Sequence, residues 1–465
     1  MSDNLGRNDT PGARELPRVL GLLDVVGILV GTVIGSGIFI VPATVAMEVQ
    51  APSLMMAVWV VGGVLSFFGA LTFAELGAMY PQAGGMYVYL RESYGRLIAF
   101  LFGWALFLVI DSGSIATLSM AFSSKYLTYF LPLGPWGVKG VAVLFIGVLT
   151  AVNYMGTRYG AAVQNILMII KLGAILAVSI VVLTFGDGNA SHFTSPSAGA
   201  LSGGLVSAFG VALVATLWAY KGWEATTFSA GELKNPQRDL PLGLLGGSAI
   251  VMALYLLANA AYLWVLPASE IAGSSRVAAD AMRVAVGAGG AGIIAFVILF
   301  SITGAANGNI LTAPRVFFAM SRDGLFFERF GRVHERFLTP HVSVLATGIW
   351  AAVLSLSGTF EQLAAYVIFG QWVFFGLTVA GVMILRRTRP DAPRPYRTWG
   401  YPVTPIIFIA AALFISINSL VAQPGNALAG LGIILLGVPA YFYWQRKVSA
   451  RAGARAAAPG AAAAD

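Results

Sequence analysis

Three glycines stand within seven positions of the first apolar stretch, which reads LLDVVGILVGTVIGSGIFIVPATVA. Because glycine inside a helix costs about 1 kcal/mol relative to alanine, Gly31, Gly35 and Gly37 predict a helix that unwinds around Gly35-Ser36-Gly37. Unwinding frees backbone N–H groups, and at the start of the following half-helix such groups form a site for a carboxylate. Gly31 and Gly35 also fit the GxxxG pattern by which membrane helices pack closely, and that interpretation stays open.

A second cluster places two charges inside apolar sequence. In WAYKGWEATTF, Lys221 and Glu224 flank Gly222 and Trp223. An ionisable residue at the centre of a membrane helix costs at least about 2.5–3.5 kcal/mol, so it usually faces a bundle interior or water. The cluster therefore predicts an aqueous cavity at a second helix break. Alternatively, Lys221 and Glu224 neutralise each other at i, i+3 spacing and only support the structure, and both interpretations can hold together.

Further polar residues lie inside apolar stretches. Lys171 stands in QNILMIIKLGAILAVSIVV with no other charge within ten residues, and a buried lysine must find a partner or lose its proton. Asp111 and Glu75 are nearer the ends of their stretches, where interfacial and functional roles fit equally. A polar strip that can hydrogen-bond Lys171 or line a pathway consists of Ser301, Thr303, Asn307 and Asn309.

The composition excludes several classes of protein. Of the 465 residues 58% are hydrophobic and 10% are charged, whereas a soluble domain carries about 25% charged residues. The chain has no cysteine, which excludes a disulfide framework, a thiolate metal site and a cysteine nucleophile. The acidic and basic candidates lie on separate stretches without a nucleophile motif, so we expect neither an enzyme nor a bound cofactor or metal.

Twelve stretches are long and apolar enough to cross a bilayer, which takes about 20 residues. They cover approximately residues 20–46, 53–79, 95–125, 137–154, 161–185, 202–229, 242–266, 290–319, 341–357, 361–385, 402–422 and 427–445. The predicted fold class is an all-α integral membrane protein with twelve transmembrane helices. The first stretch follows no cleavable signal peptide, so we expect it to remain in the membrane.

Arginine and lysine gather in alternate loops, and such loops face the cytoplasm. The basic end of the chain and the even number of spans place both termini there too. The net charge of +8 then follows from the basic residues in the cytoplasmic loops, and no nucleic-acid partner is needed to explain it.

The broken stretches are the first and the sixth, and paired breaks in matching positions of two halves indicate the binding site of an inverted-repeat transporter. The predicted segments are a cytoplasmic N-terminal segment (1–19), a first repeat of five spans (20–185), an extracellular loop (186–201), a second repeat (202–385), a cytoplasmic linker (386–401), two further spans (402–445) and a disordered cytoplasmic tail (446–465).

Four segments carry a family resemblance. GTVIGSGIFIVP, WAYKGWE with GELKNPQRDLP, NGNILTAPRVFFAMSRDG and RPYRTWGYPVTP occur in this order between about residues 20 and 440. They resemble the amino acid–polyamine–organocation (APC) superfamily and, within it, the prokaryotic relatives of the L-type amino acid transporters (LAT). The resemblance implies a LeuT-like 5+5 inverted repeat, with helices 1 and 6 broken at mid-membrane and two peripheral helices.

The resemblance also implies a binding site. The substrate carboxylate would be held by backbone N–H groups of Ser36, Gly37 and Ile38. Its ammonium would be held by carbonyl groups of Val33, Trp218 and Lys221, with the Trp218 ring as a gate. The implied substrate-binding residues are Val33, Ile34, Gly35, Ser36, Gly37, Ile38, Trp218, Ala219, Tyr220, Lys221, Gly222 and Glu224.

Three further roles follow from the resemblance. Lys171, with Ser301, would replace a sodium ion by bridging spans one and eight. Glu224 would couple protonation to transport. Lys221 departs from relatives, which tend to carry glycine, aspartate or an apolar residue, and its side chain would either pair with Glu224 or favour an acidic substrate.

The expected function is sodium-independent transport of amino acids across the cell membrane, in a bacterium the inner membrane. We expect neutral L-amino acids, moved by exchange or proton symport, with Trp372 and Phe375 as further candidates for selectivity. Alternatives are an acidic or polyamine-like substrate and a non-transporting membrane sensor. Without cysteine, no obligatory disulfide-linked subunit is expected.

Overall fold

The computed structural model describes residues 14–194, 204–357, 360–422 and 424–456, and these residues form an all-helical structure. The predicted N-terminal segment up to residue 13, residues 195–203 around the predicted extracellular loop, and the tail from residue 457 lie outside the described residues. Within them, the two strand-like partners are Leu20 and Leu233, which form an isolated parallel bridge. This bridge ties the chain before the first helix to the segment after the second break.

The helices follow one another with short connections. They are α1 (Leu22–Val33), α2 (Gly37–Val49), α3 (Pro52–Met79), α4 (Met86–Tyr94), α5 (Arg96–Ala105), α6 (Asp111–Ala121), α7 (Pro135–Tyr154), α8 (Thr157–Phe185), α9 (Leu205–Ala219), α10 (Ala225–Phe228), α11 (Pro236–Val265), α12 (Ala268–Gly273), α13 (Val277–Val286), α14 (Gly290–Thr312), α15 (Pro314–Arg322), α16 (His341–Ser357), α17 (Phe360–Thr388), α18 (Val403–Ala422) and α19 (Pro424–Ala456). A π-helical turn, Leu106–Ile110, joins α5 to α6.

Each of the twelve predicted stretches falls on a helix or on consecutive helices. Among the described residues, eight helical stretches are long and apolar enough to cross a membrane, and the bent pair α1 and α2 makes a ninth. The helices α9 and α16 are apolar but shorter. Three helices, α4, α12 and α13, lie in connections where none was predicted. The tail was predicted to be disordered from residue 446, but α19 continues to Ala456, because its alanine-rich sequence favours a helix.

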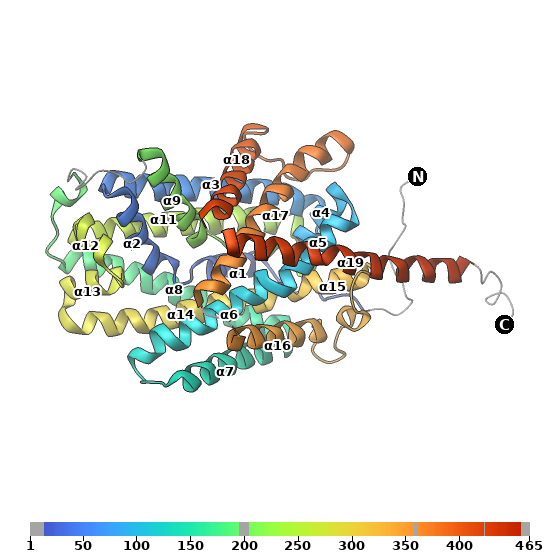
Figure 1. Ribbon diagram of the computed structural model, residues 1–465, viewed down its shortest axis with the longest axis horizontal. Coiled ribbons are helices and arrows are strands. Elements are labelled where there is room, and N and C mark those ends of the chain that lie inside the picture. The colour runs from blue at the N-terminus through green and yellow to red at the C-terminus, as the bar shows by residue number, and fades with distance from the viewer. Residues whose placement is uncertain (1–13, 195–203, 358–359, 423, 457–465) are drawn as a thin grey trace.

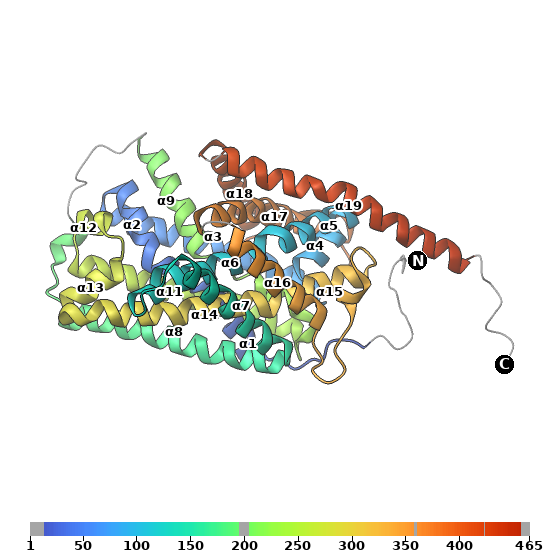
Figure 2. The ribbon, with the colours of Figure 1, turned by 60° about the horizontal axis from the view of Figure 1, so that its bottom comes forward.

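Long helices run side by side along the molecule. The helices α8 and α14 follow the long axis in both views (Figures 1 and 2), and α3 follows it in Figure 1. The helix α11 is packed on α1, α3 and α8, and α14 is packed on α1, α6 and α8. The outward face of α8 exposes large apolar side chains, among them Ile166, Ile169 and Ile180, whereas its Lys171 is buried. Apolar residues outside and a charge inside are typical of a helix that faces lipid.

A fully buried ion pair joins three parts of the chain. Arg315 of α15 donates to the carboxylate of Glu232 at 2.6 Å and to the hydroxyl of Thr157, at the start of α8, at 2.7 Å. Glu75, for which two roles were left open, accepts hydrogen bonds from Arg386 at 2.6 Å and from the N–H of Thr398 at 2.8 Å. Glu75 therefore anchors the end of α3 to the basic linker.

Candidate functional site

The first apolar stretch is interrupted where the glycines predicted it. The helix α1 ends at Val33 and α2 begins at Gly37, and the two are bent by 45°. The backbone N–H groups of Ser36, Gly37 and Ile38 have no hydrogen-bond acceptor among the described residues. The N-terminus of α2 therefore presents three unpaired donors and the positive end of a helix dipole.

The sixth stretch is interrupted as well. The helix α9 ends at Ala219, a turn covers residues 220–224, and α10 follows. Gly222 has φ +122°, a conformation that residues with a Cβ rarely adopt. The break therefore depends on glycine at this position.

The two breaks pack directly against each other. A Cβ added to Gly37 would lie 2.9 Å from the Cβ of Ala219. One added to Gly222 would lie 3.1 Å from the carbonyl carbon of Thr32 and from the nitrogen of Val33. Gly37 and Gly222 thus allow a close approach that any side chain would prevent.

A tyrosine that the sequence did not single out joins the broken ends. The hydroxyl of Tyr255, on α11, donates to the carbonyl oxygen of Val33 at 3.2 Å and lies 3.1 Å from that of Ala219. Both carbonyls lie at the C-terminal end of a broken helix. Tyr255 stands in MALYLLANA, where nothing in the spacing distinguishes it from an ordinary core aromatic.

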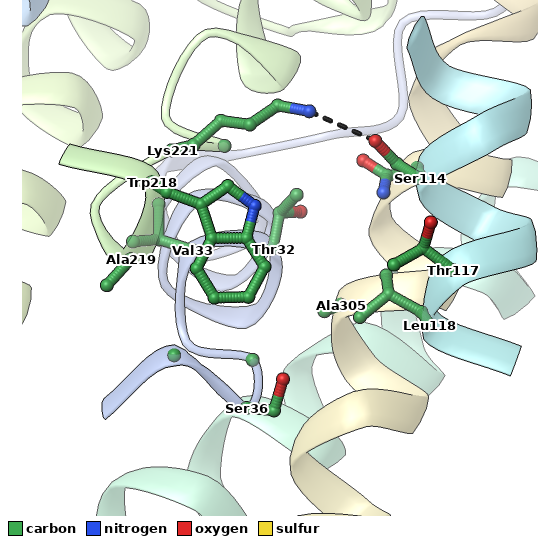
Figure 3. A pocket seen from close by; sticks show the side chains of 14 residues that line it. Thr32, Val33, Ser36, Ser114, Thr117, Leu118, Trp218, Ala219, Lys221 and Ala305 are labelled. Atoms are coloured by element: carbon green, nitrogen blue, oxygen red, sulfur yellow. Dashed lines mark hydrogen bonds between the residues drawn. The ribbon is translucent and has the colours of Figure 1, made fainter. Parts of the chain in front are cut away.

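A cavity of about 80 Å³ lies beside the two breaks (Figure 3), several times the roughly 10–15 Å³ that one water molecule needs. It is lined by Thr32, Val33, Gly35, Ser36, Gly37, Ser114, Thr117, Leu118, Trp218, Ala219, Lys221, Gly222, Ala305 and Asn309. The Trp218 ring lies between Lys221 at one end and Ser36 at the other in Figure 3. The cavity can thus contact a small polar solute through backbone and side chains together.

The structure brings most of the predicted site residues to this cavity, but not all. The predicted residues that do not line it are Ile34, Ile38, Tyr220, Glu224, Trp372 and Phe375. Tyr220 instead donates its hydroxyl to the carbonyl of Trp59 at 3.2 Å. Trp372 and Phe375, the further candidates for selectivity, lie outside this lining, and their rings pack on each other at 5.4 Å and on Trp223 and Phe408.

Sequence reasoning missed one wall of the cavity. Ser114, Thr117 and Leu118 of α6 line it, as do Thr32 and Ala305. The signal for α6 was the polar run DSGSIAT inside an apolar stretch, but a run of polar residues does not reveal which helix it faces.

Lys171 bridges the first break to α8. Its ammonium donates to the carbonyl oxygens of Gly31 at 2.5 Å and Ile34 at 2.6 Å, and a Cβ on Gly304 would lie 2.7 Å from its Nζ. Ser301 of α14 donates to the carbonyls of Ile34 and Gly35 at 3.1 and 2.9 Å. The end of α1 is therefore held by one cation and one hydroxyl.

The other three residues of the predicted polar strip do not act together, because each has different surroundings. Asn307 forms a buried amide network with Asn153 and Gln164, at 2.8 Å to each. Thr303 bonds to the carbonyl of Leu299 in its own helix. Asn309 alone of the strip lines the cavity.

Lys221 and Glu224 have different partners. The Lys221 ammonium donates to the hydroxyl of Ser114 at 3.0 Å. The Glu224 carboxylate accepts from the N–H of Gly222 at 3.0 Å and from the side-chain amide of Gln371 on α17. The part of the chain that the structure describes contains no direct Lys221–Glu224 ion pair, so the break is not closed by that pair.

Apolar helices that are long enough to cross a bilayer, and two broken helices that meet at a small polar cavity, define a multi-pass membrane protein with a site for a small solute. The amino acid permease family matches residues 20–439. The chain is 35% identical over 459 residues to the b(0,+)-type amino acid transporter 1 of Homo sapiens, covering 95% of this chain and 92% of that protein.

Two further relatives are also named as an amino acid exchanger or transporter. The serine/threonine exchanger SteT of Bacillus subtilis is 32% identical over 438 residues, covering 93% of this chain and 98% of that protein. The cystine/glutamate transporter of Homo sapiens is 32% identical over 453 residues, covering 96% and 89%. The chain belongs to the amino acid permease family of the APC superfamily, as a LAT-like member, and is a transporter and not an enzyme.

Proposed function

We propose that this protein carries neutral L-amino acids across the cell membrane by sodium-independent alternating access. The observation that carries the proposal is the pairing of unlike helix ends at one cavity. The N-terminus of α2 offers unpaired N–H groups, and the C-terminal ends of α1 and α9 offer carbonyl oxygens. A zwitterion matches both, because its carboxylate suits the positive end of a helix and its ammonium suits the negative ends.

The carboxylate would lie at Ser36, Gly37 and Ile38. Two of the three carbonyl groups predicted to accept from the ammonium already accept hydrogen bonds from the protein. The carbonyl of Val33 already accepts from Tyr255, and that of Trp218 accepts from the N–H of Lys221 at 3.3 Å. The carbonyl of Val33 also accepts from the N–H of Gly35 at 2.9 Å, and that of Trp218 also accepts from the N–H of Tyr220. A carbonyl oxygen has two lone pairs, so a substrate ammonium would share these acceptors with the protein, and Tyr255 fixes the direction of one of them.

Lys171 supports the absence of a sodium requirement. Its ammonium occupies the space between the carbonyls of Gly31 and Ile34, with Ser301 beside them. Oxygen ligands of this kind at a helix break coordinate sodium in related transporter architectures. A covalently attached cation there makes a sodium ion redundant.

The topology belongs to the same proposal. Twelve crossings, a 5+5 inverted repeat over 20–185 and 202–385, cytoplasmic termini and a bacterial inner membrane are consistent with the two breaks and the basic loops. The end of α19 and the segment before α1 lie toward the same end of the long axis in both views (Figures 1 and 2), as an even number of crossings requires.

Coupling is proposed as exchange, with proton symport as the competing mode. One relative is named an exchanger, which favours exchange. Glu224 favours symport, because it is buried at the second break and its carboxylate has, among the described residues, an amide and an N–H as its partners. Counterflow of labelled amino acid, measured with and without a pH gradient, separates the two modes.

Flux into proteoliposomes tests the function itself. We expect labelled neutral amino acids to be taken up at zero sodium, at the same rate when sodium is added. A strict sodium requirement would contradict the role of Lys171. Uptake only of acidic amino acids or polyamines would instead support the alternative substrates, and binding without flux would indicate a sensor.

A further inference from the structure

One wall of the cavity is made of polar side chains and not of broken backbone. It comprises Ser114, Thr117, Lys221 and Asn309, which we call the polar wall. The ammonium of Lys221 reaches across the cavity to Ser114 (Figure 3). Ser36 lies at the opposite end of the cavity in this view. An amino acid whose carboxylate binds at Ser36 would therefore direct its side chain toward the polar wall.

The polar wall and its surroundings contain polar atoms without protein partners. The hydroxyl of Thr117 and that of Thr32 are buried, with 6% and 7% of the residue exposed, and neither has a hydrogen-bond partner within the described part of the chain. Lys221 has three N–H donors, and its ammonium makes one side-chain hydrogen bond among the described residues. Since a buried polar group without a partner costs about 1–3 kcal/mol, this wall is suited to a ligand that hydrogen-bonds.

Two buried carboxylates, those of Asp111 and Glu224, lie near Lys221 and do not line the cavity. Asp111 lies one turn before Ser114 on the same face of α6 and is 4% exposed, and one of its oxygens has no partner among the residues that the structure describes. Asp111 and Glu224 are within electrostatic range of Lys221, but among the described residues neither forms a direct ion pair with it. With the two carboxylates ionised, the positive charge of Lys221 is offset, so Lys221 offers donors without a net attraction for anions.

We propose that Lys221 determines side-chain specificity, selecting uncharged side chains that carry an oxygen acceptor, either hydroxyl or carboxamide. The proposal rests on the amino acid transport proposed above. The ammonium of Lys221 donates to the side-chain oxygen, while the hydroxyls of the polar wall donate or accept as needed. An acidic side chain is repelled by the carboxylates near Lys221, and a cationic one is repelled by Lys221 itself. Serine, threonine, asparagine and glutamine are the substrates that match.

Competition against uptake of labelled L-alanine in proteoliposomes tests this directly. Threonine and valine have nearly the same shape and differ by one hydroxyl. We expect threonine to inhibit at a concentration about tenfold lower than valine, which corresponds to about 1.4 kcal/mol. Glutamate and lysine should both inhibit more weakly than threonine.

Two variants test which residues cause the preference for threonine over valine and over glutamate. In Lys221→Met, the threonine-to-valine preference should fall to about one, whatever the absolute rate, because the donor is gone. In Asp111→Asn, the concentration at which glutamate inhibits should fall about tenfold relative to that of threonine, because one compensating charge is removed. Lys139→Met is the matched control, since Lys139 is an exposed lysine that bonds to the carbonyl of Leu356; it should keep the preference of the unmodified protein.

The outcomes separate this proposal from the function on which it rests. Alanine uptake with equal inhibition by threonine and valine would overturn the specificity proposal and leave amino acid transport intact. Stronger inhibition by glutamate than by threonine would overturn the charge compensation by Asp111 and Glu224. No uptake of any labelled amino acid into proteoliposomes preloaded with unlabelled amino acids would overturn the transport function itself. If gel filtration shows that a variant does not fold, the competition by threonine, valine, glutamate and lysine on the unmodified protein still tests the specificity proposal.

Discussion

The hydroxyl of Tyr255 donates a hydrogen bond to the carbonyl oxygen of Val33 at 3.2 Å. The same hydroxyl lies 3.1 Å from the carbonyl of Ala219, so one side chain of α11 contacts the C-terminal ends of both broken helices. The site therefore has a fixed spacing between its two carbonyl-bearing ends before any substrate binds.

Tyr255→Phe should weaken substrate binding about two- to tenfold while the protein stays folded. Phenylalanine keeps the ring but removes the shared donor, and such a hydrogen bond contributes about 0.5–1.5 kcal/mol. Isothermal titration in detergent measures the affinity. Tyr262→Phe on the same helix is the control, because Tyr262 is buried but contacts neither broken end through its hydroxyl. Equal losses of affinity in the two variants would show that Tyr255 contributes only through the packing of its ring.

Gly37→Ala should lower substrate affinity by at least about tenfold, since overpacking typically costs about 1–3 kcal/mol. The added methyl group would meet Ala219 at 2.9 Å and force the two breaks apart. Gly35→Ala should have a smaller effect, because its Cβ would meet Ala305 at an ordinary 3.7 Å. Binding measured by thermal shift ranks the two variants, and the reverse ranking would contradict the close approach of α2 and α9.

Lys171→Met should destabilise the protein by about 1–3 kcal/mol, because it leaves a buried carbonyl without a donor. That carbonyl belongs to Gly31, whereas the carbonyl of Ile34 loses Lys171 but still accepts from Ser301. A thermal melt in detergent, followed by tryptophan fluorescence, records the change. Lys139→Met removes an exposed lysine and should melt like the unmodified protein. A Lys171→Met variant with an unchanged melting temperature would show that Lys171 does not hold the first break.

Arg315→Met should destabilise the protein by about 3–5 kcal/mol, since breaking a buried ion pair leaves an uncompensated charge. Here the carboxylate left behind is Glu232, which is fully buried. The double variant Arg315→Met with Glu232→Met should recover much of the loss, because two apolar side chains replace both charges. Fluorescence-detected gel filtration after heating measures each variant. A double variant no more stable than the single one would show that the charges are not the main cause.

The sequence by itself determined the helical membrane class, the approximate extent of its apolar stretches and the positions of the two breaks. These features are local. About 20 apolar residues must cross lipid wherever they occur, and glycines at Gly35 and Gly37, or charges at Lys221 and Glu224, disturb a helix whatever its neighbours are. Lys171 was also evident, because a lone charge in apolar sequence must have a buried partner.

Only the tertiary structure decided which residues meet across helices. Tyr255 contacts Val33 over 222 positions of sequence, and Lys221 turns to Ser114 on α6 and not to Glu224 three positions along. Trp372 and Phe375 looked like pocket residues by type, but they pack on Trp223 and Phe408. Contacts of this kind depend on the packing of whole helices, and no pattern within one stretch encodes the face that a distant helix presents to it.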